Sequence, residues 1–342
     1  MAHRFSIKDI ARQSGLGTAT VDRVLNNRAH VSPQTRNRIA AALRELAAQE
    51  AQLAASGAHY FFDVIAEAPQ RFSREIRNAA QIAASGVPGA AIRLRFQFQE
   101  IMPEDEMLAA LARIAKKGSH GICLKARDTQ RLRAAIADLA QARIPVFTLV
   151  TDLPGSARQG YFGLDNAKAG HTAAYLLAHS LPDQGATILT SRSQDSFRGE
   201  TDRLTAFRDL IATLRPDIFL IDVSGGAGVT AQTGARLDMA LATGGPVAAV
   251  YSMGGGNAAI LRSLAQRGQH PRVFVAHDLD RENTLLLATG AISYVLHHDL
   301  AKDMATLFKA AISGTATAAG DASSDVQIIT PYNLPVFTDH RA

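Results

Sequence analysis

Apolar residues in the first 46 positions recur at the three- and four-residue spacing of amphipathic helices. This spacing predicts three short helices, whose inward positions are Ile7, Ile10, Ala11, Val21, Val24, Leu25, Ile39, Leu43 and Leu46. Ser6 and Ser32 are placed to cap the first and third helices, and Gly15 ends the first. Two helices joined by a tight, glycine-containing turn form a helix-turn-helix, whose second helix enters the major groove of DNA.

Beyond residue 59 the pattern changes to short apolar segments that alternate with helical ones. The predicted strands cover residues 60–66, 92–98, 121–125, 146–150, 186–191, 218–223, 247–252, 273–277 and 292–297. This alternation predicts parallel sheets covered by helices on both faces, with ligands at the carboxyl ends of the strands. Segment 92–98 alternates strictly between apolar and polar residues, so we expect it near the edge of a sheet.

The length of this region predicts two lobes rather than one sheet. We expect the first lobe at about 59–155 with part of the C-terminal region, and the second at about 160–295. Residues 314–325 are small and polar, which predicts a loop before a last strand at 326–330. The fold class is therefore α/β, with an N-terminal three-helix helix-turn-helix headpiece (1–46), a hinge or linker (47–58) and a two-lobed, parallel-sheet effector-binding and dimerisation domain (59–342).

Positive charge is concentrated near the N-terminus. Residues 1–60 hold eight Lys and Arg against four acids, a net charge of +4 out of +5 for the whole chain. A cluster of arginines is often no more than a solvated face. Together with the helix-turn-helix pattern, it indicates binding to nucleic-acid phosphates.

The remaining composition is that of an ordinary soluble globular protein, with 47% hydrophobic and 20% charged residues. The first 15 residues lack the apolar stretch of a secretory leader, and no segment reaches the length of a membrane span, so we expect a cytoplasmic protein. The single cysteine, Cys123, excludes an intramolecular disulfide. Its neighbours Ile122 and Leu124 indicate a buried strand, where a thiol acts as a small hydrophobe.

Three segments, IKDIARQSG, TATVDRVLNN and HVSPQTRNRI, occur in this order, each separated from the next by two residues. They resemble the headpiece of the lac repressor and galactose repressor (LacI/GalR) family of bacterial transcription regulators over roughly the first 46 residues. The resemblance implies base-reading roles for Thr18, Ala19, Arg23 and His30. It also implies phosphate contacts for Asn26, Ser32 and Thr35, whose short polar groups set the register on the duplex.

Arg23 carries the most informative contact, because its guanidinium can bond both acceptors of a guanine. Ala19 offers only a methyl group to a thymine. Gly17 and Asp22 depart from the family pattern, which generally has serine at both positions. An acid beside the phosphate backbone is repulsive, so we expect Asp22 to orient Arg23 rather than to accept from a cytosine amino group.

The linker also departs from the family, which usually has a Pro-Asn pair followed by a short helix with a leucine that enters the minor groove. Here the pair is absent, and residues 47–58 predict an alanine-rich helix that Gly57 ends. Leu53 is the one residue that could insert between base steps. Packing of this leucine on the following domain is an equal alternative.

The second region resembles the type 1 periplasmic sugar-binding proteins, which the repressor family carries as its effector domain. The similarity rests on IPVFTL, GLDNAKAG, RLTAF, VAHD and HDLAKDM. It implies an effector cleft formed by Phe72, Lys125, Asp152, Arg203, Asp278 and His298. An aromatic face suits a sugar ring, and charged groups suit its hydroxyls.

Alternatives remain for several of these residues. Phe72 fits core packing and Asp152 fits a loop cap equally well. Lys125, Arg203 and His298 would make the cleft cationic, which suggests an acidic or phosphorylated sugar derivative.

Two other chemistries are possible from the residues. Residues 254–259, GGGNAA, follow a predicted strand and precede Asp278 by about 20 residues, so an NAD(P)-dependent oxidoreductase is the rival function. A glycine turn also simply permits close approach of backbone or ligand. A metal could use His277, Asp278, His297, His298 and Asp299. We favour neither reading, and expect no cofactor, no metal and no enzymatic activity.

The sequence therefore predicts a transcription repressor that is controlled by a sugar, polyol or sugar acid. A single recognition helix buries too little DNA surface for tight specificity, so we expect a homodimer on a pseudo-palindromic operator. Nothing resembles a leucine heptad that would add a tetramerisation helix.

Overall fold

The computed structural model describes residues 5–26, 28, 31–54, 58–193, 197–225, 237, 239–241, 245–314 and 322–335; the side chains of 47–54 and 322–323 are not described. The chain forms two compact units, Met1–Tyr60 with Ser85–Arg93, and Phe61–Ala84 with Leu94–Ala342. We call the helical part of the first unit the headpiece and the second unit the body. Among the described residues, no helix combines the length and apolar character needed to cross a membrane.

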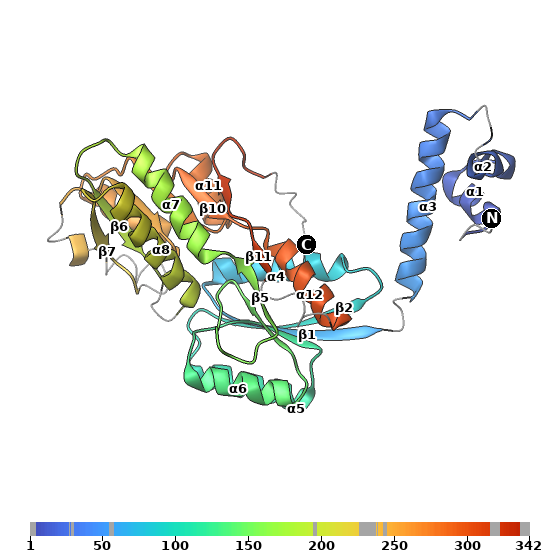
Figure 1. Ribbon diagram of the computed structural model, residues 1–342, viewed down its shortest axis with the longest axis horizontal. Helices are drawn as coiled ribbons and strands as arrows, with labels where there is room; N and C mark the ends of the chain where they lie inside the picture. The colour runs from blue at the N-terminus through green and yellow to red at the C-terminus, as the bar shows by residue number, and fades with distance from the viewer. Residues whose placement is uncertain are drawn as a thin grey trace. The chain divides into compact units, whose positions relative to one another are not determined.

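The headpiece consists of three helices, α1 (Ile7–Ser14), α2 (Thr18–Leu25) and α3 (Pro33–Ala54) (Figure 1). Ser6 caps α1, because its hydroxyl accepts a hydrogen bond from the Asp9 amide at 3.1 Å. Gly15 ends α1 with φ 63°, a left-handed conformation that glycine adopts without strain. All nine predicted inward residues belong to the apolar core, where Ile10, Val21 and Ile39 are at most 1% exposed.

Helix α3 is longer than the sequence pattern suggests. It runs for 22 residues through Ala54, so the predicted alanine-rich linker helix continues the third headpiece helix. Ala, Leu, Arg and Gln, which dominate this segment, are strong helix formers, and no Gly or Pro interrupts it. Gly57 and the side chain of Leu53 lie outside the described residues.

The first lobe of the body contains a six-stranded sheet in the order β11-β5-β4-β3-β1-β2. Its strands are β1 (His59–Glu67), β2 (Ala91–Gln99), β3 (Gly121–Lys125), β4 (Val146–Leu149), β5 (Gly160–Leu164) and β11 (Ala322–Ser324). Pairing is parallel from β1 through β3, β4 and β5 to β11. β2 occupies the edge, as its alternating pattern predicts.

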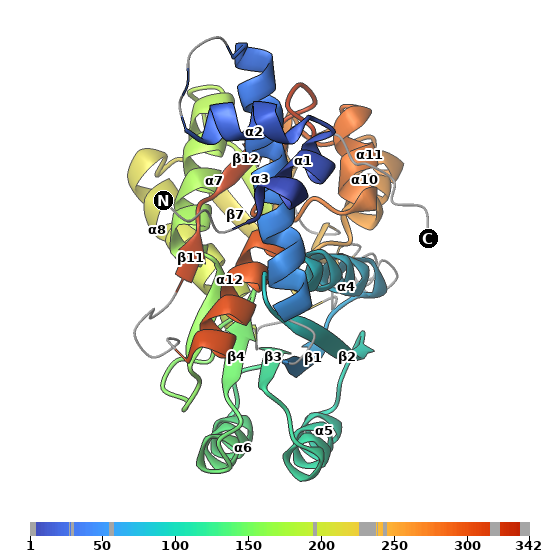
Figure 2. The same cartoon turned by 90° about the vertical axis from the view of Figure 1, so that its right-hand side faces the viewer.

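Helices cover both faces of this sheet. They are α4 (Gln70–Ser85), α5 (Glu104–Lys117), α6 (Gln130–Gln141) and α12 (Leu300–Ser313). α5 and α6 lie side by side on one face, and α4 and α12 lie on the other (Figures 1 and 2). β3, β4 and β5 are buried along their whole length, which explains why they read as continuous apolar segments.

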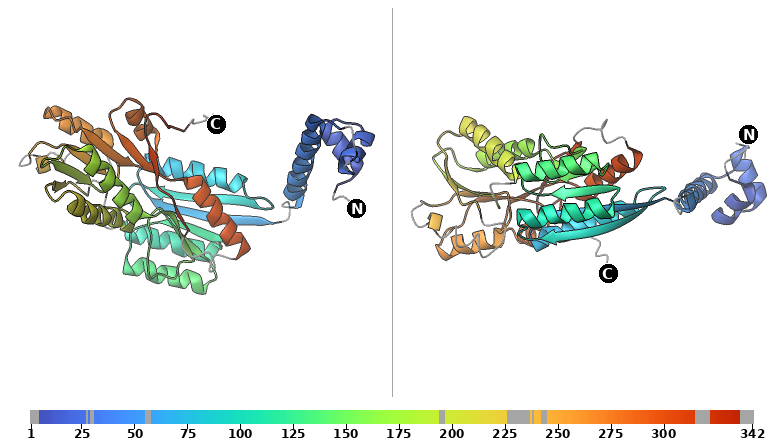
Figure 3. Two further views of the ribbon diagram at one scale, coloured as in Figure 1. Left: turned by 45° about the horizontal axis from the view of Figure 1, so that its top comes forward. Right: turned by 90° about the horizontal axis from the view of Figure 1, so that it is seen from below.

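The second lobe contains a six-stranded sheet in the order β12-β10-β9-β8-β6-β7. Its strands are β6 (Thr187–Ser191), β7 (Phe219–Asp222), β8 (Ala249–Ser252), β9 (Val273–His277), β10 (Tyr294–His297) and β12 (Gln327–Ile329). Its described helices include α7 (Asn166–Ser180), α8 (Arg198–Leu214), α10 (Asn257–Gln266) and α11 (Arg281–Ala288). Figure 3 shows the yellow-green helices α7 and α8 on one side of the sheet and the orange α10 and α11 on the other.

Side-chain alternation builds the two faces of this second sheet. Tyr251 and Val275 pack with α7 and α8, whereas Val250 and Phe274 pack with α10 and α11. β12 pairs with β10 in the antiparallel direction, so the sheet is mixed rather than wholly parallel.

The boundary between the lobes differs from the predicted one. β5 belongs to the first sheet, so the chain enters the second lobe after Leu164 rather than near residue 160. β11 lies where the sequence predicts a loop. Its residues, ASS, carry no apolar signal, and its strand is defined by backbone pairing with β5.

The chain also crosses between lobes after β10 and after β11. His298 Nδ1 lies 2.6 Å from the Asp303 carboxylate, and Ser324 Oγ lies 2.8 Å from the same carboxylate. The Ser324 hydroxyl is also 3.2 Å from the Gly163 carbonyl in β5. These polar contacts tie the three crossing segments together.

Candidate functional site

The outer face of α2 carries the predicted base-reading residues. Thr18, Ala19 and Arg23 are exposed, and the Arg23 guanidinium has no partner among the described residues. Of the predicted phosphate contacts, Asn26 and Ser32 are exposed and Thr35 is half-buried. His30, which the resemblance adds to the base-reading set, lies outside the described residues.

Asp22 does not orient Arg23, so that expectation is wrong. Its carboxylate accepts from the Asn26 amide at 2.8 Å and lies 3.4 Å from the Arg28 guanidinium. Residues i and i+4 are neighbours on a helix surface, whereas i+1 points away, so Asn26 is the natural partner. The pairing with Arg28 reduces the repulsion that Asp22 would exert on a phosphate backbone.

Ser32 and Thr35 form the start of α3. Ser32 Oγ accepts from the Thr35 amide at 3.1 Å and lies 2.9 Å from Thr35 Oγ1. This arrangement leaves polar groups at a helix N-terminus, where the partial positive charge favours an anion.

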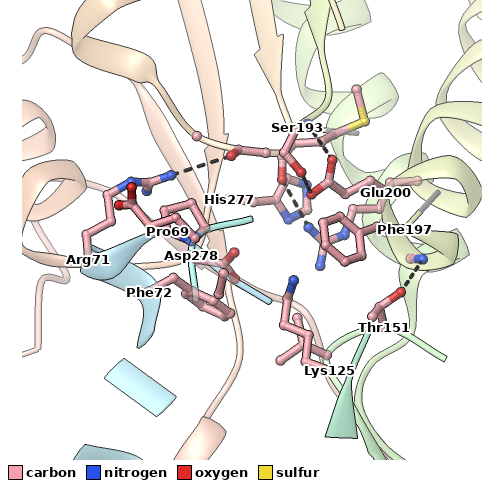
Figure 4. Close-up of a pocket in the computed structure, with 18 residues that line it drawn as sticks. Pro69, Arg71, Phe72, Lys125, Thr151, Ser193, Phe197, Glu200, His277 and Asp278 are labelled. Carbon is pink, nitrogen blue, oxygen red and sulfur yellow. Dashed lines mark hydrogen bonds between the residues drawn. The ribbon is translucent and has the colours of Figure 1, made fainter. Parts of the chain in front are cut away.

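The body contains a cleft at the carboxyl ends of both sheets (Figure 4). Residues following β1, β3 and β4 form its first-lobe wall, and residues following β6, β8 and β9, with the start of α8, form the wall from the second lobe. Its volume is about 40 Å³, so the space between the two walls is small.

Four predicted effector residues line this cleft, namely Phe72, Lys125, Arg203 and Asp278. The other two do not. Asp152 contacts Arg158 at 2.5 Å and accepts from the Leu153 amide at 2.7 Å, as a loop cap would. His298 is bound to Asp303 at the crossing described above.

The structure adds cleft residues that the sequence analysis missed, among them Arg71, Thr151, Ser193, Phe197, Glu200 and His277. Most of them directly follow a strand or the start of a helix. Because the chain has many such positions, this placement alone indicates a cleft residue only weakly. Glu200 could have been found, because it lies three residues before Arg203 on the same helix face.

Lys125 and Arg203 are deeply buried in the cleft. Lys125 is 7% exposed; its Nζ donates to the Glu67 carbonyl at 2.9 Å and lies 3.8 Å from the Phe197 ring centroid. Burial lowers the pKa of Lys125 from 10.5 to about 8. Arg203 is 2% exposed and donates through Nε to Asn166 Oδ1 at 2.7 Å and through Nη1 to the Met253 carbonyl at 3.3 Å.

His277 and Tyr251 form a buried pair. His277 Nε2 lies 2.9 Å from the hydroxyl of Tyr251, a residue of the neighbouring strand β8. Burial lowers the pKa of His277 well below 6.5 and raises the pKa of the Tyr251 phenol above its usual range. Both side chains are therefore neutral at pH 7.

Arg71 bridges the two lobes. From α4 it forms an ion pair at 2.6 Å with Asp280, the N-cap of α11, and its Nη2 lies 3.4 Å from the Gly254 carbonyl. The GGGNAA glycines permit this approach: a Cβ at Gly255 would lie 1.6 Å from Arg71 Nη2, and one at Gly254 2.1 Å from the Ser193 amide nitrogen. These two glycines therefore permit close approach between protein segments, which is the other reading of the glycine turn.

Backbone strain concentrates at the cleft. Val150 and Asp278, which directly follow β4 and β9, have φ of 66° and 64°. This left-handed region is unfavourable for non-glycine residues, and most of all for a β-branched valine. Such strain persists where the surroundings enforce it and is often found at ligand sites.

Three of the candidate metal ligands have other partners: His297, His298, which is bound to Asp303, and Asp299, which caps α12. His297 Nδ1 accepts from the Leu279 amide at 3.2 Å, and its pKa is lowered to about 4, first by burial and then by His298. Within the described ranges, no group of three or more His, Cys, Asp or Glu side chains is arranged to hold a metal ion. Cys123 is buried, and burial raises the pKa of its thiol.

Fold and cleft define a class: a two-lobed ligand-binding protein joined in one chain to a helix-turn-helix. Sequence comparison agrees, since the profile described as "Periplasmic binding protein domain" matches residues 47–316 and that of "Bacterial regulatory proteins, lacI family" matches residues 6–47. Over residues 47–316 the chain therefore belongs to the periplasmic binding protein domain family, and its headpiece is a DNA-binding domain of the lacI family type.

A curated relative is the HTH-type transcriptional regulator TreR of Salmonella typhimurium, 53% identical over 45 residues. This alignment covers 13% of the present chain and 14% of TreR, so it concerns the headpiece alone.

Solved structures share the fold of the body. GanP, a glucose-galactose binding protein from Geobacillus stearothermophilus, superposes with a TM-score of 0.71 at 19% identity, covering 81% of this chain and 99% of GanP. A solute binding protein from Burkholderia graminis, in complex with D-arabinose, gives a TM-score of 0.72 at 17% identity, covering 82% and 98%.

Proposed function

We propose that this protein is a sequence-specific DNA-binding transcription regulator, acting as a repressor, whose operator affinity is controlled by a small ligand bound between the body lobes. The observation that carries this proposal is the joining of an outward-facing recognition helix to a cleft lined by buried charged and aromatic side chains. Neither part performs chemistry on its ligand; each binds one.

Recognition of DNA follows from the exposed face of α2. Arg23 would bond a guanine, Thr18 and Ala19 would contact neighbouring bases, and His30 would add a base contact from the following loop. Asn26, Ser32 and Thr35 would hold the phosphates, with Leu53 as the candidate for minor-groove insertion. Because one headpiece reads a short half-site, we propose a homodimer on a pseudo-palindromic operator.

The ligand proposed is a sugar, polyol or sugar acid. Phe72 and Phe197 offer apolar faces to a sugar ring, and Asp278, Arg203 and Lys125 offer hydrogen bonds to its oxygens. The glucose-galactose and D-arabinose ligands of the similar structures support this class.

Control of DNA binding would arise from lobe closure. Arg71 and Asp280 already bridge the cleft, and Gly199 at the start of α8 donates to Thr151 of the other lobe at 3.0 Å. A ligand that favours the closed arrangement would shift the dimer geometry and thus the spacing of the two headpieces. We assign residues 1–46 to the headpiece, 47–58 to the linker and 59–342 to the effector and dimerisation domain, and we infer that the protein acts in the cytoplasm, where its DNA is.

The proposal is tested by selecting duplexes from a random pool with the purified full-length chain in moderate salt. We expect enrichment of a pseudo-palindrome with two half-sites, and loss of that enrichment for Arg23→Ala. Retention of random and selected duplexes to the same extent, with or without added sugars, would overturn it.

A further inference from the structure

Two buried cations in the cleft lack an anionic partner. Among the described residues, no carboxylate lies within 4.0 Å of Lys125 Nζ or of the Arg203 guanidinium; their hydrogen bonds go to backbone carbonyls and to an amide. The other arginines at this edge are paired, Arg71 with Asp280 and Arg127 with Glu67. A buried charge without an ionic partner is costly, so an anion from outside the chain would stabilise this pair.

A third donor faces the same space. Tyr251 has one described hydrogen-bond partner, His277 Nε2, and its hydroxyl hydrogen can be satisfied only by donation to that nitrogen. The proton of the neutral imidazole is then on Nδ1. His277 Nδ1 is buried without a hydrogen-bond partner, and His277 lines the cleft. His277 therefore holds an unpaired N–H donor at the wall of the cleft.

Acceptors in the cleft do not satisfy these three donors. The carboxylate of Glu200 accepts from the Ser193 amide at 2.6 Å and from the Ser193 hydroxyl at 2.5 Å. Asp278 has no described partner for its carboxylate and remains available to ligand hydroxyls. The two carboxylates still act on Lys125 at longer range, since they raise its pKa against the effect of burial.

We propose that the effector carries a carboxylate, as an aldonate or a uronate does, and that Lys125, Arg203 and His277 bind this carboxylate while Asp278 binds its hydroxyls. This inference rests on the proposed function, which by itself allows neutral sugars. A carboxylate is favoured over a phosphate, because a phosphate would bring up to two negative charges close to Glu200 and Asp278. The amino group of Lys125 points into the cleft between Phe72 and Phe197 (Figure 4).

The test is calorimetric titration of the full-length chain at pH 7 with matched ligands: D-glucuronate against D-glucose, D-galacturonate against D-galactose, and D-gluconate against D-glucitol, with D-glucose 6-phosphate as a separate arm. We expect the acid in at least one pair to bind about 10- to 100-fold more tightly than its neutral partner, as charge-assisted hydrogen bonds would give.

Variants separate carboxylate binding from structural damage. Lys125→Met and His277→Phe should each weaken binding of the acid more than binding of its neutral partner, so that the ratio of acid to neutral affinity falls toward one. Damage to the fold would instead lower both affinities together. Lys117→Met, at an exposed position of α5, is the matched control and should leave the ratio unchanged.

Each remaining outcome is decisive. Equal or tighter binding of the neutral members would overturn the carboxylate inference and leave the proposed regulator intact, and so would a ratio that survives in Lys125→Met. Binding of the phosphate alone would also overturn it. Failure of every probe to bind would overturn the inference together with the sugar-like effector of the proposed function.

Discussion

The headpiece and the body use polar side chains in opposite ways. In the headpiece Thr18 and Arg23 lie outside the apolar core and contribute nothing to it. In the body the cleft residues Lys125 and Arg203 are buried, with exposed fractions of 7% and 2%. A DNA-reading surface can therefore change without unfolding the headpiece, whereas the cleft couples ligand binding to the stability of the body.

The two regions should also respond differently to substitutions in their buried cores. The buried core of the headpiece is small, whereas several helices and two sheets share the core of the body. Substitutions that probe one region should leave the other unchanged, and the following variants measure how far this independence holds.

The largest effect should come from Ile10→Ala. Ile10 is fully buried, and removal of such a side chain costs about 2–5 kcal/mol, which a small three-helix unit cannot absorb. We expect loss of operator binding by fluorescence anisotropy, with the thermal transition of the body unchanged. The control Ile260→Ala, at a fully buried position of α10, should lower the body transition and spare the headpiece. A lower body transition in Ile10→Ala would show that the regions are not independent.

Lys125→Met should stabilise the ligand-free body. Burial lowers the pKa of Lys125 from 10.5 to about 8. That shift corresponds to about 3 kcal/mol of unfavourable charge burial at pH 7. The unfolded chain holds more protons between pH 8 and 10.5, so wild-type stability rises across this window and the advantage of the variant shrinks.

Chemical denaturation of both proteins from pH 7 to 10 measures this effect. The groups that face Lys125 and could alter the window are Glu200, Glu67, Asp278 and Arg203. Lys8→Met, at an exposed headpiece position, should show no change. A pH-independent difference between wild type and Lys125→Met would contradict the burial argument.

Arg23→Ala should act only on DNA. Loss of a bidentate contact to guanine costs roughly 1–3 kcal/mol at one operator position and relaxes the preference there. Competition with a set of duplexes mutated one base pair at a time would reveal it. A uniform loss of affinity on every duplex would instead mean that Arg23 contacts phosphate. As the control, the body of Arg23→Ala should be as stable as that of the wild type.

Ser32→Ala should have the smallest effect. The Ser32 hydroxyl accepts from the Thr35 amide at the start of α3, and loss of such a cap costs about 1 kcal/mol. We expect a slightly lower headpiece transition and similar weakening on all duplexes. Ser32→Asp restores the cap but repels phosphate, so it should recover the transition and bind DNA more weakly still.

The same contrast explains what could be predicted from the sequence. The headpiece is built from contacts between residues close in the chain, so helical spacing predicts most of its core and misses only Phe5 and Leu16 among the described members of the cluster. The error at Asp22 came from reading neighbours in sequence as neighbours in space. β11 could not be found, because a three-residue polar strand is defined by its partner.

The cleft depends on pairing across long stretches of chain. Phe72, Lys125, Arg203 and Asp278 were available from the resemblance to sugar-binding proteins. Asp152 and His298 are residue types that suit a sugar ligand, but Asp152 pairs with Arg158 and His298 pairs with Asp303. His277 was considered only as a metal ligand, because its tautomer depends on Tyr251, which the register of β8 and β9 brings beside it.

The most direct test of ligand control is the affinity of the intact chain for its selected duplex, titrated with each sugar, polyol or sugar acid that binds the body. Coupling between the two sites predicts a change of about 5- to 150-fold in duplex affinity at saturating ligand. Arg71→Ala, which removes a bridge between the lobes, should reduce that change. An affinity for the duplex that stays the same at saturation with every bound ligand would contradict ligand control.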